Sequence, residues 1–153
     1  MEIGFHSGHS AELFLKNNTS LTLTSFELLQ YQYSLNGKQY IDTTYPKRHT
    51  MIIGDSRVSV PSFINSNKNT KFDVIFIDGG HVATSDLENC FHLAHKDTIV
   101  IIDDTIFTPE LEKNWTIGPS RAWAEFLQKN RIIELGRKEY SQGRGMCWGK
   151  YVF

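Results

Sequence analysis

The stretch "FDVIFIDGGH" (residues 72–81), followed by "TIVIIDD" (residues 98–104), contains two short apolar runs that each stop at an acidic residue. Strands that are apolar on both faces are typical of a parallel sheet that helices cover on each side. The run "MIIG" (residues 51–54) repeats the pattern, and weaker strand candidates lie at residues 1–5 and 21–28. Between these runs the apolar residues recur at helical spacing, so strands and helices are predicted to alternate.

The predicted helices cover residues 10–16, 37–44, 60–65, 83–95 and 119–130. From residue 131 the pattern changes to two strand-like runs around a glycine-containing turn, which predicts an antiparallel hairpin. The fold class is therefore expected to be α/β: a Rossmann-like, doubly wound, mostly parallel seven-stranded sheet with a C-terminal antiparallel hairpin. A chain of 153 residues without a linker or repeat is expected to form one domain, residues 1–153.

Composition excludes several classes of protein. Sixteen basic and 17 acidic residues give a net charge of −1, which argues against a dedicated partner of nucleic acid or of anionic membranes. No apolar stretch approaches the ~20 residues of a membrane span, and no signal-peptide pattern opens the sequence. Cys90 and Cys147 lie outside metal-binding spacings. We therefore expect a reduced, cytoplasmic location and a small-molecule partner, while the sequence leaves the oligomeric state open.

Acidic residues stand at the ends of all five predicted parallel strands, where open α/β sheets bind their ligands. They are Glu2, Glu27, Asp55, Asp78, Asp103 and Asp104. The first loop, "EIGFHSGHS" (residues 2–10), lacks the third glycine of GxGxxG, which argues against a nicotinamide-dependent dehydrogenase. An acid beside this loop favours a ligand with a cationic amino-acid end over a pyrophosphate.

The loop "EIGFHSGHS" resembles the first motif of class I S-adenosylmethionine (SAM) methyltransferases, acidic-x-Gly-x-x-x-Gly. Together with Glu27, "GDS", "DGGH" and "DD", it is similar to the metal-dependent small-molecule O-methyltransferases of the caffeoyl-CoA type and the macrolide-sugar type. The resemblance extends from Glu2 to the terminal hairpin. It implies a SAM-binding methyltransferase domain that transfers a methyl group to a hydroxyl of a small, sugar-like or diol-like acceptor.

The same resemblance implies which residues bind the cofactor: Glu2, Gly4, Phe5, Gly8, Ser10, Glu27, Asp55, Ser56 and Asp78. Ser10 would hold the carboxylate of the methionine moiety, Glu27 both ribose hydroxyls, and Asp55 the exocyclic amine of adenine. A carboxylate suits the ribose because it accepts two hydrogen bonds at once. His6 stands where many class I enzymes have a glycine.

For the metal, the resemblance implies that Asp78, Asp103 and Asp104 bind Mg²⁺ or another divalent cation, with His81 as the base. Carboxylate oxygens on short turns suit a hard cation, and an unperturbed histidine accepts protons near neutral pH. In the alternative interpretation, Asp78 only lines the cofactor pocket and the paired acids cap a loop.

A second function class stays open at this point. Family members carry N-terminal helices that cover the site, and only Met1 precedes Glu2 in this sequence. The alternative is therefore a catalytically degenerate methyltransferase fold that serves as a binding or structural subunit.

Overall fold

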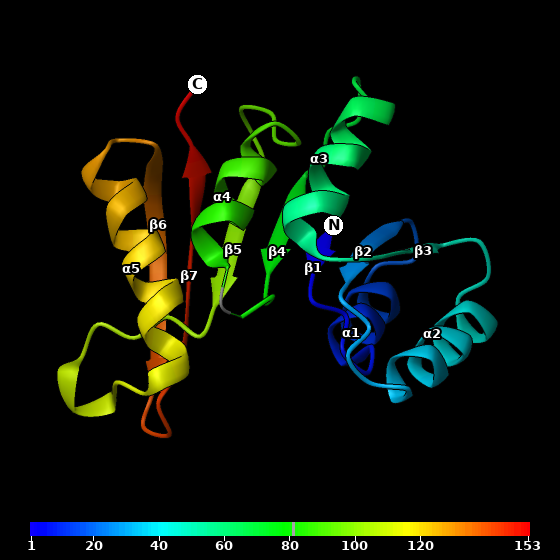
Figure 1. Ribbon diagram of the computed structural model, residues 1–153, viewed down its shortest axis with the longest axis horizontal. Coiled ribbons are helices and arrows are strands. Elements are labelled where there is room, and N and C mark those ends of the chain that lie inside the picture. Colours follow the sequence, from blue (N-terminus) through cyan, green and yellow to red (C-terminus); the bar gives the residue numbers. More distant parts are fainter. Residues whose placement is uncertain (81) are drawn as a thin grey trace.

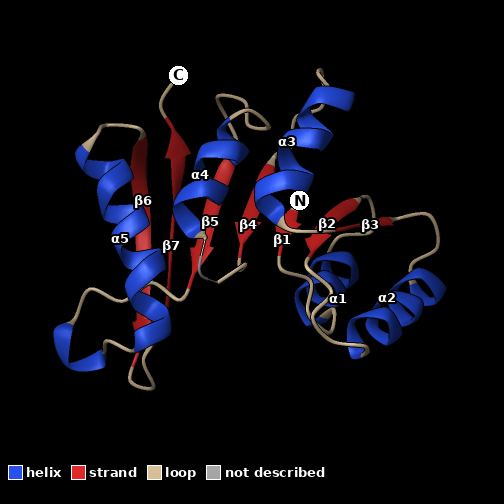
Figure 2. Cartoon of the chain, in the orientation of Figure 1, coloured by secondary structure: helices blue, strands red, loops and turns tan. Residues whose placement is uncertain are grey.

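The computed structural model describes residues 1–80 and 82–153 (Figures 1 and 2). Its elements are β1 (Glu2–Ile3), α1 (His9–Asn17), β2 (Leu23–Glu27), α2 (Tyr33–Thr44), β3 (His49–Ile53), α3 (Ser56–Ser66), β4 (Val74–Ile77), α4 (Ala83–Phe91), β5 (Ile99–Asp103), the 3-10 helix η1 (Pro109–Leu111), α5 (Asn114–Gln128), β6 (Ile132–Tyr140) and β7 (Arg144–Tyr151). In the part of the chain that is described, no helix has the length and apolar character that a membrane crossing needs.

The strands form one seven-stranded sheet in the order β3-β2-β1-β4-β5-β7-β6. Strands β1 to β5 are parallel, while β7 runs antiparallel to both β5 and β6. The predicted mostly parallel sheet with a C-terminal antiparallel hairpin is thus confirmed. The chain leaves β1 toward β2 on one side and later returns to β4 on the other, so the strand order reverses between β1 and β4. That reversal is where a doubly wound sheet opens a crevice.

Helices cover the sheet from both faces. Figure 1 shows α3, α4 and α5 side by side along one face. Their buried residues Val60, Leu87 and Trp123 belong to the larger hydrophobic cluster. A smaller cluster lies under α1 and α2. Met51 and Ile52, neighbours on β3, pack into different clusters, which places the clusters on opposite faces because successive strand residues alternate.

Helix α3 begins four residues earlier than the sequence predicts. The Asp55 carboxylate accepts a hydrogen bond from the backbone N–H of Arg57 at 2.9 Å and so caps the first turn at Ser56. The predicted start at residue 60 would put Pro61 in the first turn, but Pro61 lies inside the helix. Helix α2 also begins earlier than predicted, and α4 ends at Phe91 instead of reaching His95.

Helix α5 shows the same displacement at a second proline. The helix begins at Asn114, so Pro119 lies inside it. Its start is fixed by Thr116, whose Oγ1 accepts from the backbone N–H of Lys113 at 3.0 Å. The preference of proline for the first helical turn therefore predicts that both helices exist, but it places their first residues too late in the sequence.

One acid lies inside the larger core. Asp86, in the first turn of α4, is fully buried, and neither carboxylate oxygen has a hydrogen-bond partner within the described residues. Burial raises the pKa of Asp86 to about 6. Because the folded state binds this proton more tightly than the unfolded chain does, stability falls as the pH rises from about 4 to about 6.

We expect Asp86→Asn to raise the free energy of unfolding at pH 8 by about 3 kcal/mol, the equivalent of two pKa units, and to change it little at pH 4. Urea unfolding at the two pH values measures the change in the free energy of unfolding. Asp97→Asn, which changes an exposed aspartate, serves as the control. A variant that is no more stable than wild type at pH 8 would show that the carboxylate is compensated.

Candidate functional site

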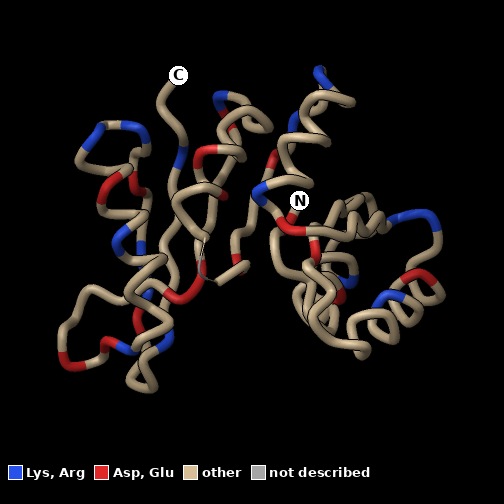
Figure 3. Tube along the Cα trace, viewed as in Figure 1, with Lys and Arg blue, Asp and Glu red and all other residues tan. Residues whose placement is uncertain are grey.

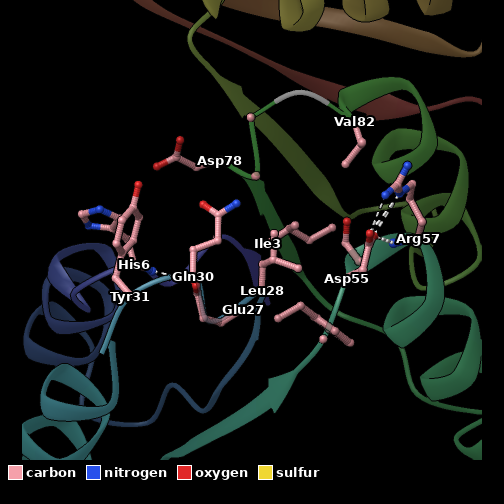
Figure 4. Close-up of a pocket in the computed structure, with 16 residues that line it drawn as sticks. Ile3, His6, Glu27, Leu28, Gln30, Tyr31, Asp55, Arg57, Asp78 and Val82 are labelled. Atoms are coloured by element: carbon pink, nitrogen blue, oxygen red, sulfur yellow. Dashed lines mark hydrogen bonds and ion pairs between the residues drawn. The ribbon is translucent and has the colours of Figure 1, made fainter. Parts of the chain in front are cut away.

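A cleft of about 410 Å³ opens at the ends of β1 to β4, where the strand order reverses (Figure 4). Its volume falls in the range of small-molecule sites. Figure 3 shows acidic positions gathered along this end of the sheet. Of the predicted cofactor residues, Gly4, Glu27, Asp55, Ser56 and Asp78 line the cleft.

Glu27, at the end of β2, forms hydrogen bonds with the first loop (residues 2–10), which we call the glycine loop. Its Oε2 accepts hydrogen bonds from the backbone N–H groups of Phe5 at 2.9 Å and His6 at 2.7 Å. Its Oε1 accepts from the N–H of Leu29 at 2.9 Å. The carboxylate is almost fully buried, yet it lines the cleft. It can therefore hold the loop and still offer its remaining lone pairs to a ligand.

The loop needs its glycines. Gly4 has φ +91°, and a Cβ there would lie 2.3 Å from the carbonyl oxygen of Asp78. Gly8 has φ +87°, and a Cβ there would lie 2.8 Å from the Phe5 ring. Phe5 and Gly8 do not line the cleft, so they shape the loop from behind.

Glu2 and Ser10 also lie behind the loop. Glu2 is fully buried and accepts from the hydroxyls of Ser10 at 2.6 Å and Ser25 at 2.7 Å. Burial raises the pKa of Glu2 despite these hydrogen bonds. Neither Glu2 nor Ser10 lines the cleft, so their predicted cofactor contacts stay predictions.

At the far side of the cleft, Asp55 pairs with Arg57, which sequence reasoning missed (Figure 4). The Arg57 guanidinium donates to the carboxylate through Nη2 at 2.6 Å and holds the pKa of Asp55 at about 2. Both side chains line the cleft, next to Ser56. The signal was available, because an arginine two residues after a helix-capping aspartate reaches back to it.

Aromatic side chains form the other wall. Tyr31 and Tyr33 stack with ring centroids 5.0 Å apart, and the Tyr33 hydroxyl lies 2.5 Å from Nε2 of His6. His6 and Tyr31 line the cleft, and Figure 4 shows them on the same side of it. Neither tyrosine was singled out from the sequence. The alternating run "QYQYS" (residues 30–34), directly after the acid of β2, is the signal that could have found them.

The predicted metal ligands Asp78, Asp103 and Asp104 border one small hollow. Burial, and then the charges of Asp103 and Asp104, raise the pKa of Asp78 to about 7. Burial also raises the pKa values of Asp103 and Asp104, and Arg144 lies 3.4 Å from Asp104 Oδ1. Among residues 1–80 and 82–153, however, no three His, Cys, Asp or Glu side chains are arranged to hold a metal ion.

The predicted base, His81, lies outside the described residues. Its neighbour Gly80 lines both the cleft and the acidic hollow.

The family described as "Methyltransferase domain" matches residues 1–105. No curated protein matches the chain. Among solved structures, a putative O-methyltransferase from Klebsiella pneumoniae is 18% identical with a TM-score of 0.74, over 98% of this chain and 71% of that one. The calicheamicin methyltransferase CalS11 is 17% identical with a TM-score of 0.71, over 98% and 70%. The Bacillus cereus O-methyltransferase in complex with S-adenosylhomocysteine (SAH) is 18% identical with a TM-score of 0.74, over 97% and 72%. At these identities the structures show a shared fold.

We expect Gly4→Ala to lower the free energy of unfolding by about 2–5 kcal/mol, because the new Cβ meets the Asp78 carbonyl and the backbone has a positive φ. Gly118→Ala is the matched control. Gly118 lies in α5 with no atom near its missing Cβ, so alanine there should stabilise the helix by up to about 1 kcal/mol. Denaturant unfolding measures both, and a Gly4→Ala chain as stable as wild type would contradict the described loop.

Proposed function

The chain belongs to the methyltransferase domain family, and on this basis we propose that it transfers a methyl group from SAM to a hydroxyl of a small acceptor. The observation that carries the proposal is the cleft at the strand reversal, which Glu27 borders with a carboxylate that also holds the glycine loop. The likeness to the folds of several O-methyltransferases supports oxygen as the atom that is methylated. We also propose, as the sequence leads us to expect, that the reaction takes place in the cytoplasm.

The residues of the cleft suit SAM. Glu27 offers carboxylate lone pairs to the ribose hydroxyls, and Asp55 lies across the cleft with Ser56, in the position proposed for adenine. Gly4 lets the backbone come close to the ligand because it has no side chain. Glu2, Phe5, Gly8 and Ser10 support the loop that presents this surface. We propose that these residues together form the cofactor site.

When bound, SAM supplies a methyl group on a sulfonium, which is a good leaving group. The chain's own contribution is then to align the acceptor hydroxyl with that methyl group and to remove its proton. We propose His81 for the proton removal, since its position in the sequence follows Gly80 at the edge of the cleft. The acceptor is proposed to be sugar-like or diol-like. CalS11 is described as a TDP-rhamnose 3'-O-methyltransferase, so one protein of this fold methylates a sugar hydroxyl.

We also propose that Asp78, Asp103 and Asp104 bind a divalent cation such as Mg²⁺. The donor set fits, because carboxylate oxygens are the ligands that hard cations prefer. The electrostatics support it, because burial, and then the charges of Asp103 and Asp104, raise the pKa of Asp78, and a positive charge would relieve the repulsion between these acids. Because no three such side chains are arranged to hold an ion among residues 1–80 and 82–153, coordination would require side-chain conformations other than those described. A bound cation would act as a Lewis acid toward the acceptor hydroxyl.

Glu27→Ala should weaken SAM or SAH binding by about 10–150-fold, because a ligand hydroxyl loses a charged acceptor. Isothermal titration calorimetry measures the dissociation constant. Glu125→Ala, an exposed acid on α5, is the control and should bind like wild type. An unchanged dissociation constant for Glu27→Ala would show that the ribose is not held at β2. A wild-type chain that binds neither ligand at millimolar concentration would favour the degenerate, non-catalytic alternative.

For the cation, titration of the chain with Mn²⁺ should show one site, and Asp104→Asn should weaken it at least about tenfold because one charged ligand is lost. Asp97→Asn, an exposed acid next to Lys150, should leave Mn²⁺ binding unchanged. Methyl transfer that continues at full rate in excess chelator would remove the metal from the proposal.

A further inference from the structure

A row of hydrogen-bonded polar side chains runs from the surface of α2 to the glycine loop; its members are Asp42, His49, Ser25 and Glu2. Nδ1 of His49 lies 3.3 Å from Asp42 Oδ1, and Nε2 of the same ring lies 2.9 Å from Ser25 Oγ. The Ser25 hydroxyl in turn donates to Glu2 Oε1 at 2.7 Å. The Glu2, Ser25 and His49 side chains are fully buried, whereas Asp42 is partly exposed. His49 was not among the candidate residues identified from the sequence.

This row meets the glycine loop at three points. Glu2 is the first residue of the segment 2–10, and its Oε2 accepts from the hydroxyl of Ser10, the last residue of that segment. Within the loop, the Phe5 ring stacks on the His49 ring with centroids 5.1 Å apart and planes 19° apart. His49 therefore contacts the loop directly through Phe5 and indirectly through Ser25 and Glu2.

The order Asp42, His49, Ser25 matches the connectivity of a hydrolytic triad. Ser25 is fully buried, however, and its hydroxyl proton is engaged by Glu2. A nucleophile needs an exposed hydroxyl whose proton passes to the histidine. The arrangement therefore holds structure in place and does not attack a substrate.

In this row of polar side chains, every hydrogen bond has both a donor and an acceptor only when one extra proton is present. An ionised Glu2 only accepts, so it takes the hydroxyl protons of Ser10 and Ser25. The Ser25 oxygen then needs an N–H from Nε2 of His49, and the ionised Asp42 needs one from Nδ1. A neutral imidazole has a single N–H. The second proton resides either on the ring or at the Glu2 end with the Ser25 hydroxyl reversed.

The charged groups around this proton come from α2, from β1 and β2, and from the end of β4. Asp42 and Lys38 face His49 from α2, and Lys38 also pairs with Asp42. Glu2 on β1 is influenced by the terminal ammonium group of Met1 and by Glu27, and it interacts electrostatically with Asp78 after β4. Burial lowers the pKa of His49; the hydrogen bond and charge of Asp42 favour a protonated ring, and the charge of Lys38 opposes it.

We propose that His49 is a positioning residue of the cofactor cleft, which through Ser25 and Glu2 holds the glycine loop in the conformation that presents the Phe5 and His6 amides to Glu27. The proposal rests on the proposed function only where it concerns SAM. The loop conformation itself is a property of the chain alone. Since a proton completes the hydrogen bonds, the loop is held at lower pH and released as the pH rises and the proton leaves.

Two substitutions separate the hydrogen-bond link from packing. His49→Gln keeps an N–H donor at the reach of Nε2, toward Ser25, whereas His49→Asn keeps a donor only toward Asp42. Both remove the stacking on Phe5. His95→Asn is the matched control, because His95 pairs with Asp73 at 3.1 Å on another part of the surface.

Amide hydrogen exchange on the full chain without ligand gives the decisive readout. At pH 6.5, His49→Asn should speed exchange of the Phe5 and His6 amides about tenfold relative to the Ile102 amide in β5, because a buried hydrogen bond is lost. His49→Gln should change this ratio less than about threefold, and His95→Asn should not change it. Equal acceleration by Asn and Gln, or none by either, would overturn the positioning role.

Asp42→Asn keeps the test valid if His49→Asn fails to fold. It removes a charge that favours the proton, so the pH at which loop exchange accelerates should fall by about one unit. An unchanged midpoint would overturn the proton's part in the proposal. In parallel, His49→Asn should weaken SAH about tenfold and His49→Gln much less. Failure of the wild-type chain to bind SAH would overturn the proposed function, while the exchange ratios would still decide the role of His49.

Discussion

The carboxylate of Glu27 accepts backbone hydrogen bonds from Phe5, His6 and Leu29, and the geometry of the whole cleft depends on these contacts. They join the loop after β1 to the end of β2, so the first two strands of the fold share one polar anchor. The buried position of Glu27 is tolerated because charged hydrogen bonds replace the water it loses. The same carboxylate faces the cleft, which makes the anchor of the loop also the candidate ligand-binding group.

Acidic residues dominate this end of the sheet, and their negative charges are compensated by different partners and to different degrees. Glu27 is satisfied by backbone N–H groups and Asp55 by Arg57. Among the described residues Asp78 has neither kind of partner. Burial, and then the charges of Asp103 and Asp104, raise its pKa to about 7. The cleft therefore has a well-compensated side, suited to a neutral polar ligand, and an under-compensated side that favours positive charge. The positive charge of a sulfonium cofactor or of a divalent cation would compensate these acids.

The order of strands and helices could be predicted from the sequence because short apolar runs that end in acids are a local pattern. The acids themselves could be placed at one edge because parallel strands end together. The link from His49 to Ser25 could not be predicted, since it joins residues 24 positions apart through a buried contact. The same holds for Tyr33 and His6. The first strand was predicted within residues 1–5; β1 has only two residues and pairs with β2 on one side and β4 on the other.

The central claim is that one cofactor binds across the ends of β1 to β4, held at Glu27. Backbone NMR shifts of the full chain during titration with SAH test it most directly. Saturable changes are expected at the amides of Phe5, His6, Leu28 and Ser56, with the hairpin of β6 and β7 unaffected. Changes confined to another surface, or no changes at millimolar SAH, would contradict it.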